Sequence, residues 1–73
     1  MIQDVRKSRG LSQSQLAEKA GISVRMLQHY EQGYKNIDHA KLATICSIAA
    51  ALNCRIEDIL NSPELKKKIV SLK

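Results

Sequence analysis

The chain has 73 residues, with one proline, three glycines and no phenylalanine or tryptophan, and twelve Lys and Arg against seven Asp and Glu give a net charge of +5. A chain this short buries only about 60% of the surface it exposes when unfolded, so it has room for one small domain. The composition favours an all-α fold over a β-sandwich, and no run approaches the roughly 18 apolar residues of a membrane span. We therefore expect a small cytoplasmic helical protein whose positive charge suits a polyanionic partner.

The first two predicted helices lie on either side of a polar connection. A short basic helix is expected over residues 2–9, with Gly10 as its left-handed stop. The next helix, over residues 13–20, begins behind Ser12, whose hydroxyl oxygen can accept a hydrogen bond from an N–H group of the first helical turn. Gln15 stands at the third helical position, where its side chain completes a capping box with Ser12. Gly21 then ends this helix in a tight joint.

A second capped helix follows immediately. Ser23 precedes an apolar periodicity over residues 24–32, and Gly33 supplies its stop. Two short amphipathic helices hinged at a glycine are typical of a helix-turn-helix motif. The second helix of such a motif can lie in the DNA major groove while the first crosses the backbone.

A longer helix is predicted after the polar residues 34–37. Asp38 is a good N-cap for it, and Ile37 with Leu42 has the spacing of a hydrophobic staple. Its core face is expected to comprise Leu42, Ile45, Ala49 and Leu52, with Cys46 and Ile48 beside them. The two cysteines, Cys46 and Cys54, are too few for a disulfide framework, and reduced, buried thiols are the expectation for both.

Two further helices are expected near the carboxyl end. A short one over residues 56–60 closes the core with Ile56, Ile59 and Leu60, and Ser62 with Pro63 is a start signal for a tail helix. In that tail, Leu65, Ile69 and Leu72 share a face while the lysines at 66–68 point away. This amphipathic tail can pack on its own domain or on a second copy of the chain.

The central pattern resembles the Xre/Cro-like helix-turn-helix family of phage repressors and bacterial regulators, which includes lambda-repressor-like domains. The resemblance covers about residues 2–60 and departs from the family in its short first helix and in Arg55, where a capping Ser or Thr is common. It implies a five-helix DNA-binding domain over residues 1–61, followed by the basic tail helix over residues 62–73. It also implies a homodimeric, sequence-specific regulator of transcription, and a repressor in particular. The residues that carry the resemblance are Gln13, Leu16, Ala17, Gly21, Ile22, Leu27, Tyr30, Glu31 and Gly33.

Residues that read DNA bases are expected on one face of the helix over residues 24–32. Arg can donate two hydrogen bonds to guanine, Gln can pair with adenine, and Val can meet a thymine methyl group. Met26, Leu27 and Tyr30 fall on the opposite face and are expected to pack. The predicted base-reading residues are Ser23, Val24, Arg25, Gln28 and His29.

A second predicted set contacts the DNA backbone. Gln13 opens the helix expected to straddle the phosphates, and the other members flank the end of the reading helix and the connection after it. These are Gln32, Tyr34, Lys35, Asn36, His39 and Lys41. For Arg6 and Glu31, the resemblance implies an ion pair that joins the first helix to the reading helix.

Other functions have weaker support in the sequence. Neither His29 nor His39 belongs to a catalytic pattern, and no spacing typical of a metal site is present, so we expect no enzymatic activity, no metal and no cofactor. A protein-interaction module or an antitoxin-type regulator on the same scaffold remains an alternative, because fold does not fix function.

Overall fold

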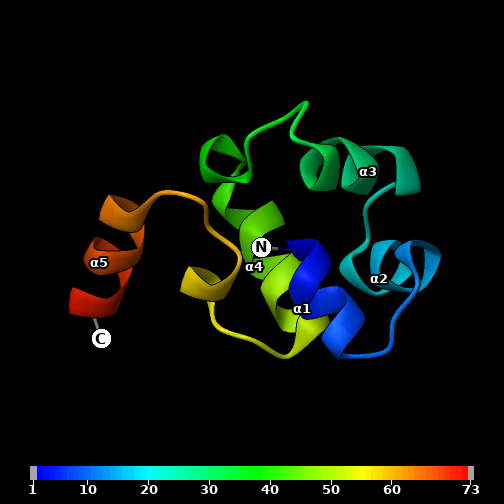
Figure 1. Ribbon diagram of the computed structural model, residues 1–73, viewed down its shortest axis with the longest axis horizontal. Coiled ribbons are helices and arrows are strands. Elements are labelled where there is room, and N and C mark those ends of the chain that lie inside the picture. The colour runs from blue at the N-terminus through cyan, green and yellow to red at the C-terminus, as the bar shows by residue number, and fades with distance from the viewer. Residues whose placement is uncertain (1, 73) are drawn as a thin grey trace.

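Five α-helices and two 3₁₀ turns follow one another along residues 2–72, the part of the chain that the computed structural model describes (Figure 1). Those residues contain no β-strand, which confirms the all-α prediction. Met1 and Lys73, the outer ends of the two predicted segments 1–61 and 62–73, lie outside the described residues. The elements are α1 (Ile2–Ser8), α2 (Gln13–Ala20), α3 (Val24–Gln32), η1 (Ile37–His39), α4 (Leu42–Leu52), η2 (Ile56–Asp58) and α5 (Pro63–Ser71).

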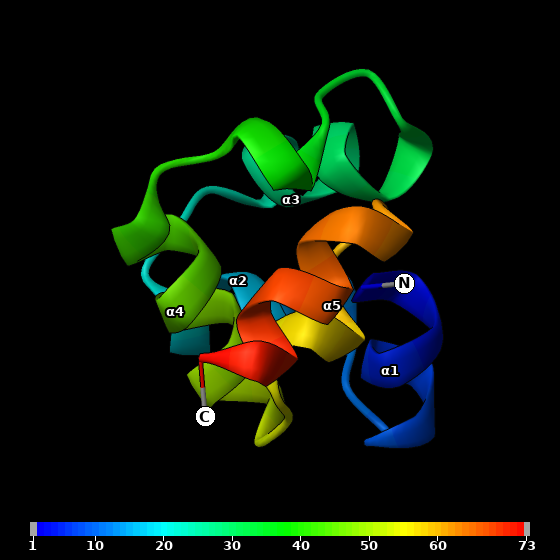
Figure 2. The same ribbon diagram turned by 90° about the vertical axis from the view of Figure 1, so that its left-hand side faces the viewer.

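In the view of Figure 1, α4 lies between the other helices. In Figure 1, α2 and α3 lie to the right of α4, and α5 lies on the far left. α2 packs against both α3 and α4, and α5 rests against η2. Turned by 90° in Figure 2, the molecule shows α3 and η1 along its upper edge, α1 on the right flank and α4 on the left flank. Within residues 2–72, no helix has the length and apolar character needed to cross a bilayer.

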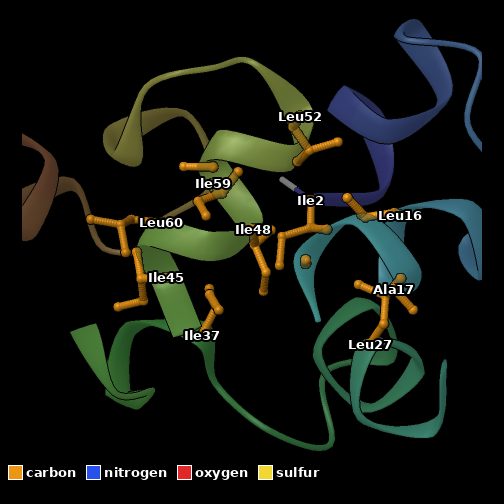
Figure 3. Close-up of a cluster of buried hydrophobic side chains, with 12 residues drawn as sticks. Ile2, Leu16, Ala17, Leu27, Ile37, Ile45, Ile48, Leu52, Ile59 and Leu60 are labelled. Carbon is orange, nitrogen blue, oxygen red and sulfur yellow. The ribbon is translucent and has the colours of Figure 1, made fainter. Parts of the chain in front are cut away.

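One cluster of apolar side chains forms the core (Figure 3). It receives residues from the first four helices, from η1 and from the segment that follows η2. Each large side chain that is fully removed from water stabilises the fold by about 1.5–3 kcal/mol. The largest fully buried side chains are Leu16, Leu27, Ile48, Leu52 and Ile59.

The predicted helix starts at the three serines are confirmed. Ser12 Oγ accepts from the N–H of Gln15 at 3.1 Å, and the Gln15 side chain accepts from the N–H of Ser12 at 2.8 Å, which completes the capping box. Ser23 caps α3, and Ser62 caps α5 directly before Pro63. These short-range bonds set where α2, α3 and α5 begin.

The predicted start of the fourth helix is wrong. Asp38 lies in the 3₁₀ turn η1, and α4 begins only at Leu42, after extended backbone at Ala40 and Lys41. The Asp38 carboxylate accepts instead from the N–H groups of Asn61 and Ser62, at 2.7 and 2.9 Å. Asp38 therefore fastens the start of α5 to η1 rather than capping α4.

Two side chains of α4 predicted to be buried face solvent. Leu42 is 68% exposed, so it neither joins the core nor forms the expected staple with the buried Ile37. Cys46 is also exposed. The core face of α4 is instead Ile45, Ile48, Ala49 and Leu52. Ile45, Ala49 and Leu52 are thus buried as predicted, and Ile48 takes the place predicted for Leu42, because most residues of α4 are apolar and the edge of its core face is not marked in the sequence.

The segment predicted as a fifth helix over residues 56–60 is a single 3₁₀ turn, η2, so the C-terminal helix is the fifth α-helix. Ile59 and Leu60 are buried as expected, whereas Ile56 is only partly buried. Leu65 and Ile69 pack against the core, but Leu72 is 81% exposed and does not share their environment.

Candidate nucleic-acid interface

A tight turn joins α2 to α3. Gly21 adopts the left-handed conformation, with φ of 71°, and its N–H reaches the carbonyl oxygens of Ala17 and Glu18. The N–H of Ile22 donates to the Ala17 carbonyl at 3.0 Å, which closes the carboxyl end of α2. A residue with a Cβ atom is strained at such a φ, so glycine is favoured here. Because Ser23 begins the next helix at once, the two helices form a helix-turn-helix.

The two faces of α3 differ in burial as the sequence pattern predicts, with two exceptions. Leu27 is fully buried and Tyr30 packs against the core, while Arg25 is exposed. Gln28 and His29 are partly exposed. The exceptions are Val24, which is half-buried and packs against the core, and Met26, which is only partly buried and lines a surface hollow. The most accessible predicted reading group on the helix is therefore the Arg25 guanidinium.

A buried ion pair ties α3 to α1. Arg6 Nε donates to Glu31 Oε2 at 2.8 Å, and Arg6 Nη2 donates to Glu31 Oε1 at 3.2 Å. The two side chains are only 9% and 1% exposed. Arg6 Nη1 also donates to the carbonyl oxygen of Leu11 at 2.8 Å, in the connection between α1 and α2. Two-point contact between guanidinium and carboxylate fixes the relative orientation of both groups.

The same carboxylate begins a chain of amides that reaches the candidate reading face. Gln13 Nε2 donates to Glu31 Oε1 at 3.0 Å, and Gln28 Nε2 donates to Gln13 Oε1 at 3.3 Å. Gln13 opens α2, so the amide chain crosses from one helix of the motif to the other. Together with Arg6, these side chains form what we call the polar clamp: Arg6, Glu31, Gln13 and Gln28.

The connection after α3 is also fixed to the end of that helix. The N–H of Lys35 donates to the His29 carbonyl at 3.1 Å. The rings of His29 and Tyr34 meet edge to face with centroids 5.9 Å apart, although Tyr34 is 76% exposed. Edge-to-face contact is a favourable arrangement for two aromatic rings. Tyr34 and His29 thus stand together beside the reading face.

Several predicted backbone contacts gather around one open hollow of about 470 Å³. Lys35, His39 and Lys41 are all exposed there, so its rim is rich in groups that can bind phosphate. Asn36 is also at this hollow, but its Oδ1 caps η1 by accepting from the N–H of Asp38 at 3.0 Å. Gln32 is exposed at the end of α3, away from this lining.

Two kinds of contribution to this surface were not predicted from the sequence. Met26 and Thr44 also line the hollow, although the helical pattern placed Met26 on the packing face. The bond between Gln13 and Gln28 joins residues 15 positions apart, and no local pattern signals it. The position of the connection directly after the reading helix was the signal that pointed to this part of the surface.

The structure offers little for metal chemistry. Among residues 2–72, no three His, Cys, Asp or Glu side chains come together as metal ligands do.

Burial, with a smaller contribution from Asp58, raises the pKa of the Cys54 thiol above its usual value and keeps it protonated. The Cys54 Sγ–H donates to the Arg55 carbonyl at 3.4 Å.

Comparison with models of known protein families matches residues 2–59 to a family described as helix-turn-helix. The match spans α1 to the end of η2 and includes the whole polar clamp. No curated protein and no solved structure matches the chain.

Proposed function

Because the chain belongs to the Xre/lambda-repressor-like helix-turn-helix family, a family of DNA-binding regulators, we propose that it is a sequence-specific transcriptional repressor that inserts α3 into the major groove as a homodimer. The observation that carries the proposal is the exposed polar face of α3, held at a defined angle by the polar clamp. A reading helix needs this combination, since base edges are distinguished by directional hydrogen bonds.

Arg25 and Gln28 supply the principal base contacts in this proposal. Arg25 is exposed and can donate two hydrogen bonds to guanine O6 and N7. The Gln28 amide nitrogen has two hydrogens, and only one is used by Gln13. The other hydrogen and the amide oxygen are free to pair with adenine N7 and N6. The clamp therefore orients Gln28 without consuming its capacity to read a base.

The remaining base-reading candidates have narrower roles. Ser23 Oγ accepts from the N–H of Met26 at 3.0 Å, so its hydroxyl hydrogen is the group left for DNA. Half-buried Val24 presents only part of its side chain to a thymine methyl group. His29 is partly exposed, and its ring makes an edge-to-face contact with the ring of Tyr34. Because His29 lies in the second half of α3, we assign it a contact at the end of the half-site.

Backbone contacts flank the reading helix on both sides. Gln13 lies at the start of α2, where N–H groups of the first turn attract phosphate. Lys35, His39 and Lys41 surround the hollow beyond the other end of α3. Tyr34, Asn36 and Gln32 complete this proposed set. These groups position the protein and carry no sequence information themselves.

The proposal also includes a homodimer on the operator and repression of the promoter that it covers. Two half-sites about 34 Å apart bring both reading helices to one side of the duplex and double the number of contacts. Such a dimer, seated over a promoter, blocks access to it. Repression is tested by placing the selected operator over a reporter promoter and measuring transcription with and without the protein.

The DNA-binding proposal is tested by selecting bound sequences from a random duplex pool at physiological salt. We expect an enriched inverted repeat, and we expect the Arg25→Ala protein to lose preference at one base pair of each half-site. Lys67→Ala, which removes one exposed positive charge from α5, outside the proposed contact sets, is the matched control. A pool without any enriched motif would refute sequence-specific binding and favour the protein-interaction alternative.

A further inference from the structure

α4 has no charged residue from Leu42 to Leu52, in a chain whose net charge is +5. Thr44 and Ser47 are the only polar residues of this helix, and a helix with so few polar residues is normally more fully enclosed than an ordinary surface helix. Here one side faces the core through Ile45, Ile48, Ala49 and Leu52, and the opposite side faces solvent. We call this exposed side the outer face of α4: Leu42, Ala43, Cys46 and Ala50.

The outer face lies on the flank of the molecule, beside the proposed reading surface and not within it. In Figure 2, α4 forms the left flank, with α3 and η1 above it and no other element outside it. Leu42 is 68% exposed at its upper end. Ala43, Cys46 and Ala50 continue the exposed surface along the helix from Leu42, and contiguous apolar surface of this kind can mark an interaction site.

We propose that a second copy of this chain covers the outer face of α4, around a two-fold axis that passes beside the helix. This inference rests on the proposed homodimer and names the surface that forms it. A surface opposed to its own copy meets identical charges, and like charges held together across an interface cost several kcal/mol. A face without charge avoids that cost in an otherwise basic molecule.

The dimensions of the molecule suit this arrangement. It measures 32 × 23 × 20 Å, and the flank formed by α4 in Figure 2 faces along the shortest of these axes, so two copies paired there have centres roughly 20 Å apart. Equivalent points on the far sides of the two copies then lie up to about twice that distance apart, a range that includes the 34 Å between successive half-sites. Because α4 flanks the molecule while α3 lies along its upper edge, pairing through α4 leaves both reading helices on one side. Pairing through the α3 face itself would cover the reading groups.

The proposed interface is small. Eleven residues of helix extend about 16 Å, and one such face per copy falls at the low end of interface sizes. We therefore expect a weak dimer in solution, with a dissociation constant in the micromolar range, that DNA strengthens by holding both copies together.

Sedimentation velocity without DNA tests the interface. We expect the wild-type protein to shift from monomer to dimer as its concentration rises, and Leu42→Glu to weaken that association at least about tenfold by opposing two carboxylates. A Glu at the start of α4 is favourable to the helix, so folding is retained, which melting temperatures verify. Leu72→Glu is the matched control, with the same change at the exposed leucine that directly follows α5, and is expected to leave association unchanged.

Three outcomes overturn the inference, and each is distinct from failure of the DNA-binding proposal. If Leu72→Glu abolishes association and Leu42→Glu does not, α5 forms the interface. If Leu42→Glu associates as the wild type does, the outer face of α4 is not the contact. If the wild-type protein stays monomeric at every concentration, no such interface forms, and selection from the duplex pool still decides whether the protein reads DNA.

Discussion

Replacing Glu31 with alanine is expected to destabilise the fold strongly, and to affect stability more than it changes base preference. Glu31 is 1% exposed on its side chain, and it is the acceptor for Arg6 and Gln13. Its removal strands the guanidinium of Arg6 in the interior, with only the Leu11 carbonyl as partner. Breaking a buried pair from one side costs about 3–5 kcal/mol.

That loss is large for a chain of this size. At about 0.05–0.15 kcal/mol per residue, the whole domain has a stability of roughly 4–11 kcal/mol. Each kcal/mol lowers the melting temperature of a small domain by about 4–8 °C, so Glu31→Ala is expected to melt roughly 12–40 °C below the wild type. Thermal unfolding followed by circular dichroism at 222 nm measures this shift.

Two further variants isolate the cause of the Glu31→Ala effect. Gln32→Ala, at the exposed neighbouring position, is expected to melt close to the wild type. Arg6→Met combined with Glu31→Leu is expected to recover much of the lost stability, since replacing both partners by apolar groups leaves no buried charge unpaired. A Glu31→Ala protein that melts within about 2 °C of the wild type would refute the reasoning, because a buried ion pair of this geometry cannot be broken without cost.

The remaining predictions concern DNA contacts and the thiols. Arg25→Ala is expected to cost about 1–3 kcal/mol of binding to the selected operator, or roughly 5- to 150-fold in affinity, and to relax preference at one base pair; unchanged affinity in a fluorescence-anisotropy titration would contradict it. Lys35→Ala is expected to weaken binding to all duplexes alike and to reduce the slope of log affinity against log salt by about 1, whereas loss confined to the operator would show a base contact. At pH 8 and low micromolar protein, Cys46 is expected to react with a maleimide well before Cys54, whose raised pKa leaves less thiolate; mass spectrometry of Cys46→Ser and Cys54→Ser proteins measures both rates, and equal rates would contradict the burial of Cys54.

The contribution of Cys54 to the free energy of unfolding is expected to decrease at high pH. Its pKa is raised in the folded state, so the thiol is equally protonated in both states well below pH 9.0, and its contribution to stability is then fully present. Above pH 9.0 the unfolded chain loses this proton first, and stability falls as the pH rises through the folded pKa.

Local interactions were predictable from the sequence because both partners lie within one helical turn. Ser12, Ser23 and Ser62 each bond to an N–H three residues ahead, and each helix begins where its serine indicates. Asp38 has the same chemistry, but its carboxylate finds partners 23 and 24 residues away. Sequence reasoning assigned it to the nearest helix because nothing local identifies a partner at that separation.

The spacing of apolar residues predicted burial least well in the helix where polar and apolar residues alternate least clearly. In α3, polar and apolar residues alternate with the helical turn, and most of the burial follows the pattern. In α4 every residue from Leu42 to Leu52 is uncharged and most are apolar, so several faces fit the core equally well. Packing against α2 and η2 selects Ile45, Ile48 and Leu52, and leaves Leu42 outside.

The polar clamp makes two positions of the reading face differ in how freely they can be substituted. Arg25 reaches solvent with no partner among the side chains of the clamp, so new base preferences introduced there leave the scaffold intact. A new side chain at Gln28 also alters the support of Gln13, and through it the surroundings of Glu31. Libraries that aim to retarget this protein should therefore vary position 25 alone, and vary position 28 only together with position 13.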